Sequence, residues 1–250
     1  MMSLFNDEYK GIRTVLQKII ENKWVPAGSG NFSLIDHKHI FADTYLYHNQ
    51  SIRLKKKLTY LANSSIVISA SGISFEEIRD NFSDLTLMVN INKNGDEIKL
   101  SGSSKFNHLQ ISSEYLSHLY LLNHFKKIKS DNTVLIHVHI PEFIAITHHL
   151  SYKSSNSLTH LIWSMFPEVK NVLPNGICYV PYQKSGSEQL AESTIKNYFN
   201  QELTVWEKHG VVAAGKSLEK AFNVLEMATE ALKIFFLCRN AAYYPEDIIF

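Results

Sequence analysis

The sequence is poor in cysteine and has no long apolar run. Its two cysteines, Cys178 and Cys238, each lie inside a short apolar segment, which suits buried thiols in a reducing compartment better than a disulfide framework. No stretch approaches the ~20 apolar residues of a membrane span, and the start, MMSLFNDEYKG, lacks a basic region followed by an apolar one. We therefore expect a cytoplasmic protein without a membrane partner.

The sequence also lacks an excess of either charge. Its formal net charge is +1, so it offers no basic footprint for nucleic acid, and the run RLKKK at 53–57 is typical of a solvated loop. There is no internal repeat and no low-complexity segment. With 45% hydrophobic residues in 250, the chain can bury one substantial core, and we expect 1–250 to form a single domain.

Hydrophobic periodicity predicts several helices and strands. A helical stripe ending before Pro26 is formed by Ile12, Val15, Leu16, Ile19 and Ile20. Further helices are predicted from Ser112 to Phe125, over 141–149 and 189–199, and over 217–238 with Ser217 as N-cap. Strands are predicted after PAGSG, over 63–70, 85–91, 134–140 and 203–207. This alternation favours an α/β or α+β domain with a central sheet covered by helices.

The strand VLIHVHI, residues 134–140, carries two histidines separated by one residue. Side chains at i and i+2 lie on the same face of a strand, so the imidazoles of His137 and His139 should project side by side. Such a pair is a natural half of a metal site. Two core or edge histidines with satisfied ring nitrogens are the alternative, and the pair by itself does not exclude it.

A third histidine, His209, stands immediately before Gly210, where the chain can turn sharply. By itself it would be interpreted as a surface turn residue. With His137 and His139 it makes three nitrogen ligands and one open position, the arrangement of a catalytic zinc. Zinc so held acts as a Lewis acid on a substrate oxygen.

An acid–base candidate and three anion-binding loops accompany the histidines. Glu114 begins the helix that leads into the histidine strand, although it could equally be an ordinary first-turn glutamate. Ser112 and Ser113 place hydroxyls and free backbone N–H groups at the same helix end, where phosphate is well bound. The segments 28–31 and 71–72, rich in Gly, Ser and Asn, can also offer amides to an anion.

These motifs carry a family resemblance. GSGNFSL, ISASG, ISSE, HVH and WEKHG follow the order and approximate spacing of the class II aldolase/adducin family, over most of the chain. The resemblance implies a central, mainly antiparallel sheet packed by helices. It also implies a zinc-dependent aldehyde-lyase that forms a homotetramer with active sites near subunit interfaces.

The resemblance assigns roles to individual residues. By helix spacing alone, His118 could lie one turn beyond Glu114 on the same face and support it, although its default interpretation is structural or solvent-facing. The resemblance implies that zinc is bound by His137, His139 and His209, and that Glu114 is the catalytic acid–base. It implies that the substrate phosphate is held by Asn31, Ser71, Gly72, Ser112 and Ser113. Glu168, aligned through Trp163, is implied to reach the active site of an adjacent subunit. Gly28 departs from the family pattern, which usually has a polar Asn or Thr there.

The expected reaction follows from the resemblance. A ketose 1-phosphate, expected to be L-rhamnulose 1-phosphate, would be cleaved to dihydroxyacetone phosphate and L-lactaldehyde, with Glu114 moving a proton at carbon and Glu168 acting at the aldehyde oxygen. The long segment between Asn31 and Ser71 and the stretches LIWSMFPEVKNVLPNGI and VPYQKSGSEQLAEST favour this sugar over fuculose 1-phosphate.

Other interpretations of the same motifs stay open. A pentulose-phosphate 4-epimerase and a methylthioribulose-phosphate dehydratase use the same scaffold and zinc. A non-catalytic adducin-like scaffold would be expected to lack the metal histidines. A zinc hydrolase would have no use for three phosphate-binding loops.

Overall fold

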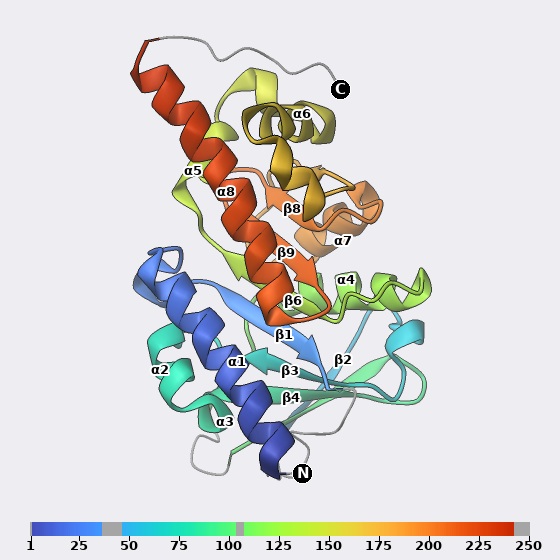
Figure 1. The fold of residues 1–250 in the computed structure, drawn as a ribbon. Coiled ribbons are helices and arrows are strands. Elements are labelled where there is room, and N and C mark those ends of the chain that lie inside the picture. Colours follow the sequence, from blue (N-terminus) through green and yellow to red (C-terminus); the bar gives the residue numbers. More distant parts are fainter. Residues whose placement is uncertain (1, 37–46, 104–107, 243–250) are drawn as a thin grey trace.

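One large mixed sheet organises the structure. The computed structural model describes residues 2–36, 47–103 and 108–242 (Figure 1). Nine strands form a sheet in the order β2-β5-β4-β3-β1-β6-β9-β8-β7, in which β7 and β8 are parallel and every other neighbouring pair is antiparallel. The strands are β1 (Asn31–Ile35), β2 (Tyr47–Arg53), β3 (Ser65–Ser69), β4 (Thr86–Ile91), β5 (Glu97–Gly102), β6 (Val134–Val138), β7 (Ile177–Val180), β8 (Leu203–Trp206) and β9 (Gly210–Gly215). The expected α/β architecture with a mainly antiparallel sheet is confirmed.

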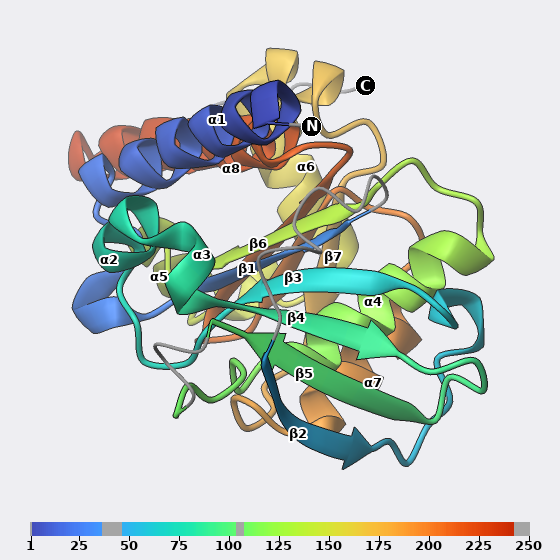
Figure 2. The same cartoon turned by 90° about the horizontal axis from the view of Figure 1, so that it is seen from below.

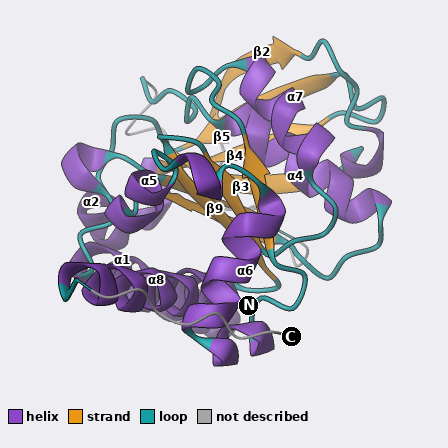
Figure 3. Cartoon of the chain, turned by 90° about the horizontal axis from the view of Figure 1, so that it is seen from above, coloured by secondary structure: helices purple, strands orange, loops and turns teal. Residues whose placement is uncertain are grey.

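Helices cover both faces of this sheet. The long helices α1 and α8 run side by side over one face, and α4 and α7 lie on the other (Figures 2 and 3). The helices are α1 (Met2–Glu21), α2 (Phe75–Asp80), α3 (Phe82–Leu85), α4 (Tyr115–Lys127), α5 (Pro141–Ile146), α6 (Ser155–Met165), α7 (Glu188–Asn197) and α8 (Leu218–Asn240). Because β6 and β9 are covered on both sides, their residues are all buried.

The local sequence signals account for the long helices. In α1 the predicted stripe is buried at Ile12, Val15, Leu16 and Ile19. In α8 the Ser217 hydroxyl accepts a hydrogen bond from the backbone N–H of Lys220, so this residue is the predicted N-cap. Both cysteines lie buried. Among the helices of the described residues, none combines the length and apolar character that a membrane crossing needs.

Two predicted helix boundaries lie three residues from those in the structure. Helix α4 begins at Tyr115 rather than at Ser112, so the segment 112–114 precedes the helix, and the carbonyl oxygen of Ser112 accepts a hydrogen bond from the backbone N–H of Tyr115 at 3.1 Å. Helix α5 ends at Ile146 instead of continuing to 149, because Thr147 takes the C-cap position.

Candidate metal centre and active site

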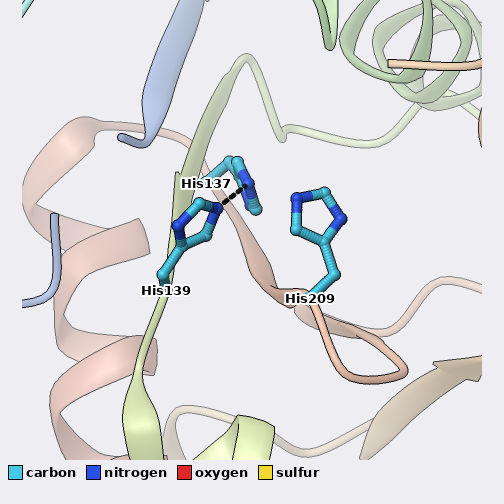
Figure 4. Close-up of side chains that lie close together, drawn as sticks. All are labelled: His137, His139 and His209. Carbon is cyan, nitrogen blue, oxygen red and sulfur yellow. Dashed lines mark hydrogen bonds between the residues drawn. The ribbon is translucent and has the colours of Figure 1, made fainter. Parts of the chain in front are cut away.

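The three histidines predicted as ligands come together at one end of strands β6 and β9. His137 lies in β6, His139 follows the end of that strand, and His209 lies in the turn between β8 and β9 (Figure 4). The Nε2 atoms of His137 and His139 are 3.0 Å apart, and one potential ligand atom from each of the three rings lies within 4.8 Å of the others. This group could hold a metal ion.

The protonation states of these rings suit a metal ligand. Nδ1 of His137 donates a hydrogen bond to the carbonyl oxygen of Val211 at 2.9 Å, which leaves a lone pair on Nε2. Burial, together with the rings of His209 and His139, holds the pKa of His137 well below its usual value. Burial also lowers the pKa of His139, and burial and the His139 ring lower that of His209 to about 4. All three rings are therefore neutral at pH 7, the form that binds metal.

Small and flat neighbours allow the rings to approach so closely. A side chain at Gly210 would bring its Cβ to 2.5 Å from the carbonyl oxygen of Val138 and 2.9 Å from the His139 ring. Trp206 stacks against the His209 ring, with centroids 5.1 Å apart and planes inclined by 22°, and its centroid lies 4.8 Å from that of His137. The indole thus forms one wall of the histidine cluster.

Glu114 lies beside the histidines and is almost completely buried. Its Oε1 accepts a hydrogen bond from the backbone N–H of Gly186 at 3.0 Å and lies 3.6 Å from Nε2 of His209. Its Oε2 is buried without a hydrogen-bond partner among the described residues. Burial raises the pKa of Glu114 to about 7, although the Gly186 N–H acts in the opposite direction. A half-ionised carboxyl with one unsatisfied oxygen, beside the neutral His209 ring of the cluster, is a setting that a bound cation would stabilise.

A pocket of about 270 Å³ opens over this cluster. Every predicted site residue except Glu168 lines it. Strand pairing explains part of this arrangement, because Asn31 at the start of β1 is the register partner of His137. The bridge between Ala70 and Ile111 then brings the loop at 71–72 next to the segment 112–114.

The loops around the pocket carry unsatisfied polar groups. Oγ of Ser29 and Oδ1 of Asn31 are buried and have no hydrogen-bond partner among the described residues. Buried polar atoms are normally paired, so unpaired ones beside a pocket indicate the position of a polar ligand. The Ser29 hydroxyl stands next to Gly28, the position at which the sequence departs from the family pattern.

Glu168 lies apart from this group. It is exposed in a short 3-10 turn, Pro167–Asn171, and does not line the pocket. The indole N–H of Trp163, the residue through which Glu168 was aligned, donates to the carbonyl oxygen of Leu173. Within one chain, therefore, the structure does not bring Glu168 to the histidines.

Two further features concern the surroundings of Glu114. The ring of His118, for which a structural role was the default interpretation, has its Nδ1 2.7 Å from Oγ of Ser33 in strand β1. Ser185 lines the pocket and Gly186 contacts Glu114, yet neither was predicted. The Lys-Ser-Gly-Ser run around them has an ordinary loop composition, so it gave no signal of a contact with Glu114.

Comparisons with known proteins agree with the motifs. A family model described as the class II aldolase and adducin N-terminal domain matches residues 11–236. A rhamnulose-1-phosphate aldolase from Bacteroides thetaiotaomicron is 33% identical over 137 residues, which is 55% of this chain and 51% of that protein. Another protein of that name, from Listeria welshimeri, is 26% identical over 99% of this chain and 88% of its own length.

A solved structure shares the fold. The sugar-phosphate aldolase from Thermotoga maritima superposes with a TM-score of 0.80 at 20% identity, covering 96% of this chain and 98% of that one. At this identity the likeness shows the arrangement of strands and helices and nothing finer.

Proposed function

Because the chain belongs to the class II aldolase and adducin family, we propose that it is a zinc-dependent aldolase acting on L-rhamnulose 1-phosphate. The reversible products would be dihydroxyacetone phosphate and L-lactaldehyde. The family and the aldolase names of the relatives support a lyase, and the relatives' names support this substrate. The single observation that carries the proposal is the meeting of three neutral histidines, Glu114 and the hydroxyl-bearing loops in one pocket.

His137, His139 and His209 are the proposed zinc ligands. Three neutral imidazoles with room for a further ligand are typical of catalytic zinc rather than structural zinc. When bound, zinc would act as a Lewis acid that stabilises negative charge developing on the substrate oxygens. The hydrogen bond from His137 to Val211 orients its ring for this purpose, as such bonds do in many metal sites.

Glu114 is the proposed acid–base. A carboxyl with a pKa of about 7 can both accept and release a proton near neutral pH. The Gly186 N–H fixes one oxygen, which leaves the other, Oε2, free to exchange a proton with the substrate. In the condensation direction this proton would leave the carbon of dihydroxyacetone phosphate that becomes the nucleophile.

The loops on the other side of the pocket are proposed to hold the substrate phosphate. The residues are Asn31, Ser71, Gly72, Ser112 and Ser113. Hydroxyls and backbone N–H groups donate to phosphate oxygens without burying an opposite charge. These loops would anchor the dihydroxyacetone phosphate part of the substrate, so that the binding energy is used to orient it.

We further propose that the protein is a homotetramer in which Glu168 completes the active site of a neighbouring subunit. Its exposed position, away from the pocket of its own chain, supports this proposal. To test this, the variants Glu114→Gln and Glu168→Gln, each expected to be inactive, are dissociated, mixed and reassembled. Mixed oligomers should regain part of the activity, because some sites then combine both intact carboxylates. Mixed oligomers that regain no activity would contradict this proposal.

A cytoplasmic location stays a prediction.

A coupled assay for dihydroxyacetone phosphate tests the proposed reaction. Protein loaded with zinc and protein stripped by a chelator would each receive L-rhamnulose 1-phosphate or L-fuculose 1-phosphate. We expect zinc-dependent release that is faster from the rhamnulose ester. Faster release from the fuculose ester would mean that L-fuculose 1-phosphate is the preferred substrate. No release from either ester by zinc-loaded protein would overturn the aldolase proposal, and product analysis would then test for epimerisation or dehydration.

A further inference from the structure

The turn that carries His209 has an unusual backbone. Residues 207–209 join β8 to β9, and Lys208 in the middle has φ +57°, a left-handed conformation that residues other than glycine seldom adopt. Such a conformation persists only where the surroundings hold it. The contacts that hold this turn therefore decide where the His209 ring lies.

The first of these contacts is a buried hydroxyl. Oγ1 of Thr147 accepts a hydrogen bond from the backbone N–H of Lys208 at 2.9 Å and donates one to the carbonyl oxygen of Ile144 at 2.7 Å. Thr147 is fully buried and caps helix α5, which begins two residues after His139. The Thr147 hydroxyl thus connects helix α5, which follows His139, with the turn that carries His209.

The second contact is a buried carboxylate. Oε1 of Glu207 pairs with Nζ of Lys153 at 2.6 Å, and Oε2 accepts the backbone N–H of Tyr182 at 3.0 Å. The Lys153 side chain is 32% exposed, so this ion pair is only partly buried. The two hydrogen bonds hold the Glu207 carboxylate, and with it the start of the turn, in one position, and neither Glu207 nor Thr147 lines the pocket.

We propose that Thr147 and Glu207 are positioning residues that set the His209 ring against His137 and His139 before a metal ion arrives. The inference rests on the proposed metal site. Ligands held in place in advance need no ordering when the ion binds, so affinity is higher than with a loose turn. Thr147 acts on the backbone one residue before the ligand, and Glu207 fixes the end of β8 that leads into the turn.

Substitutions at Thr147 separate the hydroxyl from the shape of the side chain. Thr147→Val keeps the volume and removes the hydroxyl, whereas Thr147→Ser keeps the hydroxyl. Zinc affinity of chelator-stripped protein would be measured by competition with a chromogenic chelator, and ligand geometry by the visible absorption of the cobalt form. We expect Thr147→Val to weaken zinc binding by about 10-fold to 100-fold, the range for outer-shell changes, and to alter the cobalt spectrum. Thr147→Ser should restore both.

Thr229→Val is the matched control. Thr229 is also fully buried, and its hydroxyl donates to the carbonyl oxygen of Leu225 in α8, away from the histidines. Thr229→Val removes the same atoms from a buried threonine, so it should lower the thermal midpoint of stripped protein without changing zinc affinity. Weaker zinc binding by Thr229→Val would attribute the Thr147→Val effect to general destabilisation and overturn the inference.

The remaining outcomes distinguish the inference from the proposed function. If wild type binds one zinc and Thr147→Val matches it in affinity and cobalt spectrum, the positioning role is wrong and the metal site stands. If folded wild type binds no zinc, or His209→Asn binds it equally well, the metal site is wrong and the inference falls with it. Should Thr147→Val fail to fold, Glu207→Gln replaces it, since the amide can still accept the Tyr182 N–H but loses the ion pair. A zinc affinity equal to that of wild type would then overturn the inference.

Discussion

The backbone N–H of Gly186 donates a 3.0 Å hydrogen bond to Oε1 of Glu114, a residue 72 positions earlier in the sequence. Gly186 has φ +69°, and a Cβ at this position would lie 3.0 Å from Cβ of Ser113. Only glycine meets both conditions without displacing the loop. The loop before α7 therefore fixes one oxygen of the proposed acid–base.

The substitution Gly186→Ala should raise the pKa of Glu114 further. The Gly186 N–H lowers this pKa, because it stabilises the ionised carboxylate, while burial raises it to about 7. Displacement of the loop would remove the hydrogen bond from Gly186 and leave the effect of burial. Carbon NMR titration of labelled glutamate in stripped protein would measure the pKa of Glu114, with Glu114→Gln to assign the signal. A pKa that is unchanged or lower would contradict this account of the hydrogen bond.

Metal binding should release protons near pH 7, and they should come from Glu114. A carboxyl with a pKa of about 7 is roughly half protonated there, and a nearby cation favours the carboxylate. The histidines contribute none, because their lowered pKa values leave them already neutral. The release should shrink as pH rises above 7.

Calorimetry of zinc binding in buffers of different ionisation enthalpy measures this release. The Glu114→Gln protein, which has no titrating carboxyl at this position, should release almost none. Equal release from wild type and from Glu114→Gln would show that the protons come from another group.

His118 should make the folded protein sensitive to acid. Burial lowers the pKa of His118 to about 3, and its unfolded value is 6.5. Between these values the unfolded chain binds more protons, so stability is fully present above pH 6.5 and is lost as pH falls towards 3. The contribution of one such group is at most about 1.4 kcal/mol per pH unit. Urea unfolding of wild type and His118→Gln between these pH values measures the difference in slope, and equal slopes would exclude His118 as the cause.

Two glycine substitutions should change stability in opposite directions. Gly210→Ala would force a Cβ to within 2.5 Å of the Val138 carbonyl oxygen and separate β9 from β6, so both the free energy of unfolding and zinc affinity should fall. Gly11 lies in helix α1 with nothing within 4 Å of the added Cβ. Gly11→Ala should therefore stabilise by about 0.5–1 kcal/mol and leave zinc affinity unchanged. Chemical denaturation measures the free energy of unfolding of both variants. An unchanged free energy for Gly210→Ala would mean that β6 and β9 can move apart without cost.

The elements that the sequence predicts well are those whose signal is local. The stripe of α1 repeats with the period of a helix, Ser217 caps α8 through a residue three positions on, and His137 and His139 share a face because they are two residues apart in an extended segment. Each of these follows from backbone geometry over a few residues. Glu114 and the three loops were singled out by residue type and by their place at a helix start or in a Gly/Ser/Asn-rich segment, and resemblance to a family then assigned their roles.

The sequence by itself determined which residue types are available: three histidines that stay neutral when buried, a carboxyl, and loops rich in hydroxyls and glycine. Only the tertiary structure decided that Asn31 pairs with His137, that Gly186 reaches Glu114, and that Thr147 holds the turn before His209. The physical reason is that these contacts join residues far apart in the sequence: Gly186 and Glu114 are separated by 72 positions, and Asn31 and His137 by more. They depend on strand order and on how helices close over the sheet, which short-range periodicity does not encode.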